Sequence, residues 1–244
     1  MRISVDSCLD HVLGVLLPPC CVLCQGPGQA PALDLCAGCA ADLPAAGRER
    51  CTLCALPLEP GQGPVCSGCR AAPPQFARCL AAFEYAPPVD HLVQDLKYHG
   101  RLANGRVLGT LLADAVRVPG GPAGAACGAD LVVPVPLHPT RLAERGYNQA
   151  EEIARWTARA LGLAFAPRGL RRLRATPPQV GLGRATRWAN LADAFDGSAR
   201  LAGRRVVLVD DVVTSAATAN SAAAAALAAG ADRVEVWAVA RAGH

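Results

Sequence analysis

The stretch VVLVDDVVTSAAT, from Val206 to Thr218, decides the fold of this chain. Its first four residues are apolar and mostly β-branched, and they lead into Asp210 and Asp211, two further valines and five small residues. A continuous apolar run without alternation predicts a strand covered on both faces, as in a parallel sheet. The alanine-rich segment 217–229 contains neither glycine nor proline, so it predicts a helix whose N-terminal amides can hold an anion.

The two adjacent carboxylates indicate what kind of ligand would fit beside these amides. They would repel a bare phosphate, but they suit a ligand that carries hydroxyl groups near its phosphate, such as a ribose 5-phosphate. The alternative is a strand with a polar end and a Ser/Thr helix cap. The pattern over the whole stretch favours a binding site.

The same residues resemble the phosphoribosyl diphosphate (PRPP) motif of type I phosphoribosyltransferases, in which an apolar strand meets two acidic residues and a threonine-rich loop. The resemblance implies that Asp210 and Asp211 face the ribose hydroxyls and are the catalytic carboxylates. It also implies that a short loop wraps the 5-phosphate, and this loop consists of Thr214, Ser215, Ala216, Ala217 and Thr218.

Ala216 departs from this motif, because the family usually has glycine at that position. Glycine is used where the backbone needs a positive φ or approaches a ligand closely. If the loop needs that geometry, the alanine costs about 1 kcal/mol or more. Weakened PRPP binding is the expected consequence.

The cysteines predict two metal sites in the N-terminal quarter. Eight of the twelve cysteines form four CxxC pairs, and each pair starts fifteen residues after the one before. Two such pairs supply the tetrahedral sulfur cage that Zn²⁺ prefers, so four pairs predict two structural zinc ions. Redox-active dithiols or an iron–sulfur centre are the alternatives. The ligands are Cys21, Cys24, Cys36, Cys39, Cys51, Cys54, Cys66 and Cys69.

The spacing leaves the pairing of these knuckles open between two sequential ribbons and an interleaved arrangement. The other four cysteines, Cys8, Cys20, Cys79 and Cys127, have no partner at metal-ligand spacing and are expected to be ordinary small apolar residues.

Composition divides the chain into four parts: a short helix within 1–19, a glycine- and proline-rich ribbon over 20–70, a linker over 71–78, and an α/β domain over 79–244. The ribbon cannot bury enough surface to fold alone, so metal must supply its folding energy. Residues 1–70 carry four basic against six acidic side chains, which argues against a nucleic-acid-binding ribbon and favours a structural or protein-docking role.

The expected elements of the α/β domain alternate between strand and helix. Strands are predicted over 79–85, 130–135, 206–209 and 232–240, and helices over 88–98, 102–116, 150–161 and 217–229. This alternation predicts a parallel sheet flanked by helices. No apolar run is long enough to span a membrane and the N-terminus lacks a signal-peptide core, so no membrane insertion and a cytoplasmic location are expected.

Three cationic side chains are candidates for holding a pyrophosphate. Arg141 and Arg145 are expected in the loop after the strand over 130–135, where open α/β sheets bind ligands. Lys97 is the only lysine beside twenty-three arginines, which favours a role for its compact ammonium group. The alternatives are solvent-exposed arginines and a solvated lysine at a helix end.

Positive charge is concentrated in the middle of the chain. Residues 141–187 contain ten arginines and three glutamates, and a field of this sign attracts PRPP, other nucleotides or single-stranded DNA. Aromatic side chains for base stacking are sparse there, which favours a small anionic ligand over a nucleic-acid track.

Nearly the whole chain resembles the ComF family, which joins a double zinc ribbon to a type I phosphoribosyltransferase-like domain. The cysteine knuckles carry the resemblance, together with LKYHG, PVPLHPTRLAERGYNQ, RATPPQVGLGRATRWANLADAF and VLVDDVVTSAAT. It implies a PRPP-binding protein linked to DNA uptake in natural transformation, with single-stranded DNA or the uptake machinery as partners. It also implies Mg²⁺ with PRPP and a flexible loop that bears Gln179, Arg187 and Asn190.

Three functions are compatible with these observations. The first is a ComF-type PRPP-binding protein that serves DNA uptake. The second is an active phosphoribosyltransferase of nucleobase metabolism, in which Asp210 or Asp211 stabilises the positive charge that develops on the ribose. The third is a PRPP- or nucleotide-sensing adaptor without catalysis. The fold alone does not decide among them.

Overall fold

The computed structural model describes residues 18–29, 33–47, 49–118, 128–174 and 194–243. Its centre is a five-stranded sheet in the order β1-β7-β6-β2-β3, and every neighbouring pair in it is parallel. The strands are β1 (Cys79–Glu84), β2 (Leu131–Pro134), β3 (Ala164–Phe165), β6 (Arg205–Val213) and β7 (Arg233–Arg241). The expected α/β fold with a parallel sheet flanked by helices is confirmed.

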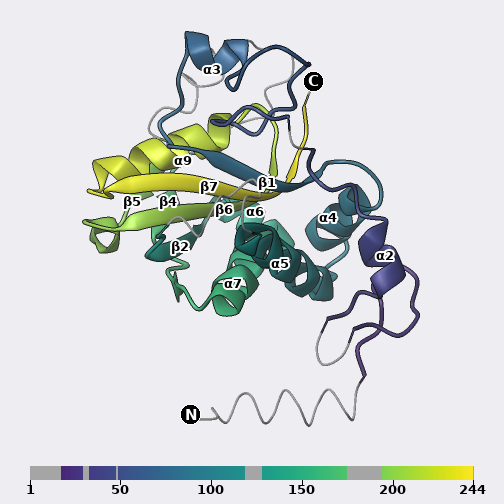
Figure 1. Cartoon of the computed structure of the whole chain (residues 1–244). Helices are drawn as coiled ribbons and strands as arrows, with labels where there is room; N and C mark the ends of the chain where they lie inside the picture. Colours follow the sequence, from purple (N-terminus) through teal and green to yellow (C-terminus); the bar gives the residue numbers. More distant parts are fainter. Residues whose placement is uncertain (1–17, 30–32, 48, 119–127, 175–193, 244) are drawn as a thin grey trace, which may run out of the picture.

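Helices cover both faces of this sheet (Figure 1). Helix α9 (Ala217–Ala228) packs on one face, and α4 (Val89–Tyr98), α5 (Leu102–Arg117) and α7 (Gln149–Leu161) pack on the other. The alanines of α9 form one buried stripe against β6 and β7, because their small side chains let the helix lie close to the sheet. The central strands β6 and β7 are therefore apolar over most of their length, as expected for strands covered on both faces.

Helices α5 and α7 pack closely at Gly109. A Cβ atom at Gly109 would lie 2.6 Å from the Ile153 carbonyl oxygen, which no side chain tolerates. Thr157 uses this proximity, since its hydroxyl donates to the Gly109 carbonyl at 3.0 Å. The core on this face therefore has a fixed helix pair beneath β1, β7 and β6.

Four smaller elements complete the domain. Helix α6 (Pro139–Arg145) follows β2, and the strands β4 (Leu170–Arg172) and β5 (Phe195–Gly197) form an antiparallel pair. A 3₁₀ turn, η1 (Ala199–Leu201), then leads into β6. The expected strands and helices of the domain are all present, with ends shifted by a few residues. The helix expected within 1–19 falls mostly in 1–17, outside the described residues.

The ribbon segment is an internal repeat with a period of thirty residues. In the first copy the amide of Cys21 donates to the Gly26 carbonyl, and in the second the amide of Cys51 donates to the Leu56 carbonyl. Each copy ends in a short helix capped by a cysteine, and these helices are α2 (Ala37–Ala41) after Cys36 and α3 (Ser67–Ala71) after Cys66.

The ribbons cover the exposed edge of the sheet at β1. Ala45 forms an antiparallel bridge with Phe83, and the amide of Cys79 donates to the Leu53 carbonyl at 2.7 Å. Leu35 and Leu43 of the first ribbon join the core beneath α4 and α5, whereas Ala55 of the second joins the core under α9. The ribbons therefore protect an edge strand that would otherwise pair with other chains.

Candidate anion site and metal centres

The candidate anion site lies where β6 and β2 end side by side. From β6 the chain continues through α9 to β7 on one side, and from β2 it continues through α6 and α7 to β3 on the other (Figure 1). The connections therefore diverge between these two strands. In open α/β sheets the crevice at such a point, beyond the carboxyl ends of the strands, is where ligands bind.

Strand β6 continues past its apolar run and carries both carboxylates. Strand β2 pairs with β6 only up to Pro134, which lies opposite Val209. Beyond Val209, the edge of β6 that faces β2 has no neighbouring strand among the described elements. Asp210 and Asp211 come directly after this point, while β7 still holds the other side of β6. The two carboxylates are thus fixed by the sheet and placed at its carboxyl edge.

Lys97 forms an ion pair with Asp211. Its ammonium nitrogen lies 2.9 Å from Asp211 Oδ2, and the Asp211 side chain is 5% exposed against 21% for Lys97. Burial alone would lower the pKa of Lys97, but the charges of Asp211 and Asp210 raise it above its ordinary value. Lys97 is therefore a charged group of the site.

Asp210 has a different environment from its neighbour. Burial and the adjacent charge of Asp211 raise the pKa of Asp210 to about 8, although Lys97 acts in the opposite direction. Its Oδ1 accepts a hydrogen bond from the Asp211 amide at 2.9 Å. The pair therefore offers one carboxylate balanced by an ammonium group and one carboxyl group that holds its proton at neutral pH.

Within the loop Thr214–Thr218, Ala216 has a positive φ. Ala216 has φ +60° and ψ +9°, the left-handed conformation that glycine adopts without strain. Ala216 is also the N-cap of α9, and its side chain makes no capping hydrogen bond; Ser215 Oγ instead accepts from the Ala217 amide at 3.4 Å. At position 216 an alanine therefore has a backbone conformation that glycine would adopt more easily.

Lys97, the partner of Asp211, opens onto a cleft of about 500 Å³. Lys97, Arg141 and Arg145 all line it, and so do Tyr98, Gly100, Glu144 and Tyr147. The structure therefore brings together the three cations that the sequence suggested for a pyrophosphate. The Arg145 guanidinium also stacks on Tyr98, 5.6 Å from the ring centroid, and hydrogen-bonds Gln149.

The expectation that Arg141 and Arg145 lie in a loop is wrong, because both belong to helix α6. Pro139 suits the first turn of a helix, and His138 Nδ1 accepts from the Thr140 amide at 3.3 Å. Gly146 ends the helix with φ +82°. The next helix, α7, begins as expected, with Asn148 Oδ1 accepting from the Ala150 amide at 3.1 Å.

Arg172 of β4 is a further cation of the site that the sequence did not single out. Its guanidinium lies 5.3 Å from the centroid of the Phe195 ring. Burial and the charge of Arg141 lower the pKa of Arg172, while the charge of Asp210 acts in the opposite direction. Nothing in the sequence distinguishes it from the nine other arginines of residues 141–187. Gln179, Arg187 and Asn190 lie outside the described residues.

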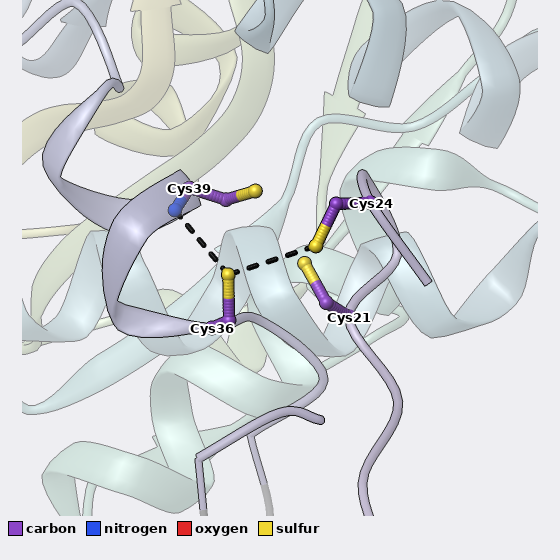
Figure 2. Close-up of side chains that lie close together, drawn as sticks. All are labelled: Cys21, Cys24, Cys36 and Cys39. Atoms are coloured by element: carbon purple, nitrogen blue, oxygen red, sulfur yellow. Dashed lines mark hydrogen bonds between the residues drawn. The ribbon is translucent and has the colours of Figure 1, made fainter. Parts of the chain in front are cut away.

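The eight cysteines form two clusters in sequential pairing. Cys21, Cys24, Cys36 and Cys39 form the first cluster, and Cys51, Cys54, Cys66 and Cys69 form the second. Within each cluster the sulfur atoms lie within 4.8 Å of one another. Figure 2 shows the first cluster, in which all four side chains converge and the Cys39 amide donates to Cys36 Sγ. Four converging sulfurs fit tetrahedral Zn²⁺, and the interleaved pairing is excluded.

The two clusters differ in their exposure to solvent. All four cysteines of the second cluster are buried, and Leu53, Leu56, Leu58 and Val65 pack around them. In the first cluster Cys24 is exposed, and Cys36 and Cys39 are partly exposed. Of the remaining cysteines, Cys79 is buried as expected, whereas Cys20 is exposed and donates to the Gln25 carbonyl. Cys8 and Cys127 lie outside the described residues.

Comparisons with known proteins agree with this architecture. A family model described as the double zinc ribbon domain matches residues 12–71. The DNA utilization protein YhgH of Salmonella typhimurium is 33% identical over 228 residues, which cover 92% of this chain and 98% of that protein. Competence protein F of Haemophilus influenzae is 29% identical over 234 residues, covering 91% and 96%. The chain belongs to the ComF family.

Membership of the ComF family confirms the resemblance of the sequence motifs. Among solved structures, this ComF-family chain is similar to the B. subtilis glutamine PRPP amidotransferase complexed with ADP and GMP, with a TM-score of 0.38, 23% identity, and coverage of 55% of this chain and 26% of that chain. It is also similar to TT1426 from Thermus thermophilus, with a TM-score of 0.33, 21% identity, and coverage of 56% and 82%.

Within the part of the ComF-family chain that the structure describes, no helix is both long enough and apolar enough to cross a membrane.

Proposed function

We propose that this ComF-family protein binds PRPP at the carboxyl edge of β6 and β2 and serves DNA utilisation. The observation that carries the proposal is the Lys97–Asp211 ion pair, because it joins the carboxylates of β6 to the cationic cleft. Carboxylates, cations and a helix N-terminus meet at one edge, and PRPP carries hydroxyl groups between two anionic ends.

Each part of PRPP has a matching group in this arrangement. The 5-phosphate would bind the loop Thr214–Thr218, at the amides of the first turn of α9. The ribose hydroxyls would donate to Asp210 and Asp211. The pyrophosphate would enter the cleft lined by Lys97, Arg141 and Arg145, whose charges hold phosphate oxygens well.

Mg²⁺ fits the donor set of this edge. Carboxylate oxygens of Asp210 and Asp211 are the kind of ligand it prefers, and it commonly binds through one or two carboxylates together with substrate phosphates. Bound there, it would neutralise pyrophosphate charge. Asp210 holds a proton at neutral pH, so the approach of a dication would favour its ionised form.

DNA utilisation is proposed from the relatives, whose names are DNA utilization protein YhgH and competence protein F. Single-stranded DNA or the uptake machinery would then be the partner. The eight clustered cysteines are free of disulfides, which fits a reducing compartment such as the cytoplasm. The ribbons pack on the sheet edge, in agreement with a structural role.

An active phosphoribosyltransferase is the second candidate, and the position of Asp210 and Asp211 favours it. Cleavage of the bond to pyrophosphate builds positive charge on the ribose, and carboxylates fixed by the sheet would stabilise that charge without reorganising. A non-catalytic nucleotide-sensing adaptor would use the same site for binding alone.

Calorimetric titration with PRPP in the presence of Mg²⁺ tests the proposal. Binding is expected for the intact protein, and it should weaken at least about tenfold in Asp210→Asn/Asp211→Asn, since neutral amides would replace the charged Asp211 carboxylate and the Asp210 carboxyl group that the ribose hydroxyls would contact. Absence of binding, or unchanged binding in this variant, would overturn it. A pyrophosphate-release screen over nucleobases and single-stranded DNA then separates transferase from binding protein.

A further inference from the structure

Arg241, the last residue of β7, is a buried arginine that connects two distant parts of the chain. It is 5% exposed. Its Nε donates to the Cys54 carbonyl at 2.9 Å, and its Nη1 donates to the Val213 carbonyl at 3.0 Å. Nη1 also hydrogen-bonds the Ala242 carbonyl. One planar side chain therefore bridges a ribbon and a strand that are far apart in the sequence.

Both of these carbonyls belong to functional segments. Cys54 is a member of the second cysteine cluster, in the knuckle where the Ala55 amide donates to the Cys51 carbonyl. Val213 is the last residue of β6, and the anion loop (Thr214–Thr218) follows it directly. Arg241 thus links the second cluster to the start of the loop Thr214–Thr218.

The positive charge of Arg241 also indicates a connection to the second cysteine cluster. Among the described residues, its guanidinium has hydrogen bonds to carbonyls and no ion pair with a carboxylate. A buried charge without a counter-charge is strongly unfavourable. Four thiolates holding one Zn²⁺ carry a formal charge of −2, and the Cys54 carbonyl that Arg241 binds belongs to that cluster.

The second cluster fits the metal. Its four side chains are at most 4% exposed, and its sulfurs accept amide hydrogen bonds, from Cys66 to Cys51 Sγ and from Cys69 to Cys66 Sγ, both at 3.4 Å. Amide hydrogen bonds to sulfur stabilise thiolate ligands. A loaded second cluster therefore supplies Arg241 with both a fixed carbonyl and a compensating negative charge.

We infer that Arg241 is a positioning residue through which metal loading of the second cysteine cluster orders the anion loop Thr214–Thr218. When the cluster loses its metal, the Cys54 thiolate is no longer held in place and the Cys54 carbonyl becomes a less fixed anchor for Arg241. The Val213 carbonyl then keeps the Ala242 amide as its fixed donor. The first cluster has a different attachment, since Asp34 of its ribbon pairs with Arg106 of α5, on the other side of the sheet. Only the second cluster is then coupled to the loop.

Hydrogen–deuterium exchange of the full zinc-loaded chain, without PRPP, tests this coupling. In Arg241→Met and in Cys66→Ser, amide exchange over residues 213–218 should rise about three- to tenfold, the effect of one lost hydrogen bond. The Arg241→Met/Cys66→Ser double variant should exchange no faster than either single variant, because both changes break one connection. Cys36→Ser, the matched change in the first cluster, should leave 213–218 unchanged.

Protection over β2 (131–134) reports whether each variant is folded. If β2 is not protected in Arg241→Met, Arg241→Lys replaces that variant. Lysine keeps the charge, but all its donors lie on one nitrogen, so it does not reproduce the separate bonds of Nε to Cys54 and of Nη1 to Val213. Arg241→Lys should therefore still raise exchange over 213–218. Unchanged exchange over 213–218 in the Arg241 variants, additive effects in the double variant, or an equal response to Cys36→Ser would overturn the inference. Because the measurement contains no PRPP, it stands apart from the calorimetric test of the proposed function.

Discussion

The Lys97 ammonium group lies 2.9 Å from the Asp211 carboxylate and ties the last turn of α4 to strand β6. This contact spans the two sides of the proposed site, since Lys97 also lines the cleft and Asp211 lies beside Asp210 on the strand. The pair therefore has a structural role and a proposed ligand-binding role together.

Lys97→Met should destabilise the protein by about 2–3 kcal/mol, because Asp211 would keep a buried charge without its partner. This cost is below that of breaking a fully buried ion pair, since Lys97 is partly exposed. Urea denaturation measures the change. Adding Asp211→Asn should recover most of the loss, as a double-mutant cycle would show.

The exposed pair of Arg171 and Asp196 provides the control for this prediction. Its side chains are 73% and 50% exposed, so Arg171→Met should change stability by less than about 0.5 kcal/mol. Equal effects of the two substitutions would contradict a special role for Lys97.

Ala216→Gly should stabilise the protein by up to about 1 kcal/mol, because glycine adopts φ +60° without the strain that alanine carries there. The entropy that glycine loses on folding reduces the gain. The midpoint temperature of thermal unfolding should rise by about 2–4 °C for each kcal/mol gained in a chain of this size. PRPP affinity should rise together with it, which titration of the variant measures.

Ala224→Gly in the same helix is the matched control for this substitution. Ala224 is exposed within α9, where glycine costs about 1 kcal/mol relative to alanine. We therefore expect Ala216→Gly to raise the free energy of unfolding and Ala224→Gly to lower it. A loss of stability at both would show that Ala216 is not strained.

Asp210→Asn should stabilise the protein above pH 5. The folded state raises the pKa of Asp210 to about 8, whereas the unfolded chain releases this proton near pH 3.9. The unfolded state therefore binds fewer protons between these two values, and stability falls as pH rises through that range. Asparagine removes the effect, and the gain should reach at least about 1 kcal/mol by pH 8, measured by urea denaturation from pH 4 to 8.5.

Asp130 provides a control of opposite sign. Its hydrogen bonds with Arg205 lower its pKa to about 2, so its stabilising contribution is present at neutral pH and disappears as pH falls through the range between about 4 and 2. Asp130→Asn should therefore destabilise the protein at neutral pH. If both variants show the same pH dependence, the environment described for Asp210 is wrong.

The sequence predicts most of the fold because its central strands are continuous apolar runs and its longer helices have periodic apolar or alanine-rich sequences. β6 and α9 follow from the residues around Asp210, and the two metal centres follow from the CxxC pairs. The pairing of the knuckles could not be predicted, because a uniform spacing of fifteen residues fits both arrangements.

Contacts between distant segments are what the sequence did not predict. Lys97 and Asp211 are far apart in the chain and meet only through the packing of α4 on the sheet. Arg141 and Arg145 were expected in a loop, since a helix of seven residues is too short for a periodic apolar pattern. Arg241 has no distinguishing sequence pattern around it, and its burial depends on a ribbon that comes early in the chain.

A chelator should remove the two zinc ions in two separate steps. The first cluster has the exposed Cys24, whereas all four cysteines of the second are buried beneath leucine and valine side chains. Solvent and chelator reach exposed thiolates sooner, so one equivalent of zinc should leave rapidly and the other slowly. A chromogenic chelator measures both phases. Alkylation followed by mass spectrometry should label Cys24 and Cys39 in the fast phase and Cys54 and Cys66 only in the slow one, and simultaneous labelling of both clusters would contradict the difference in burial.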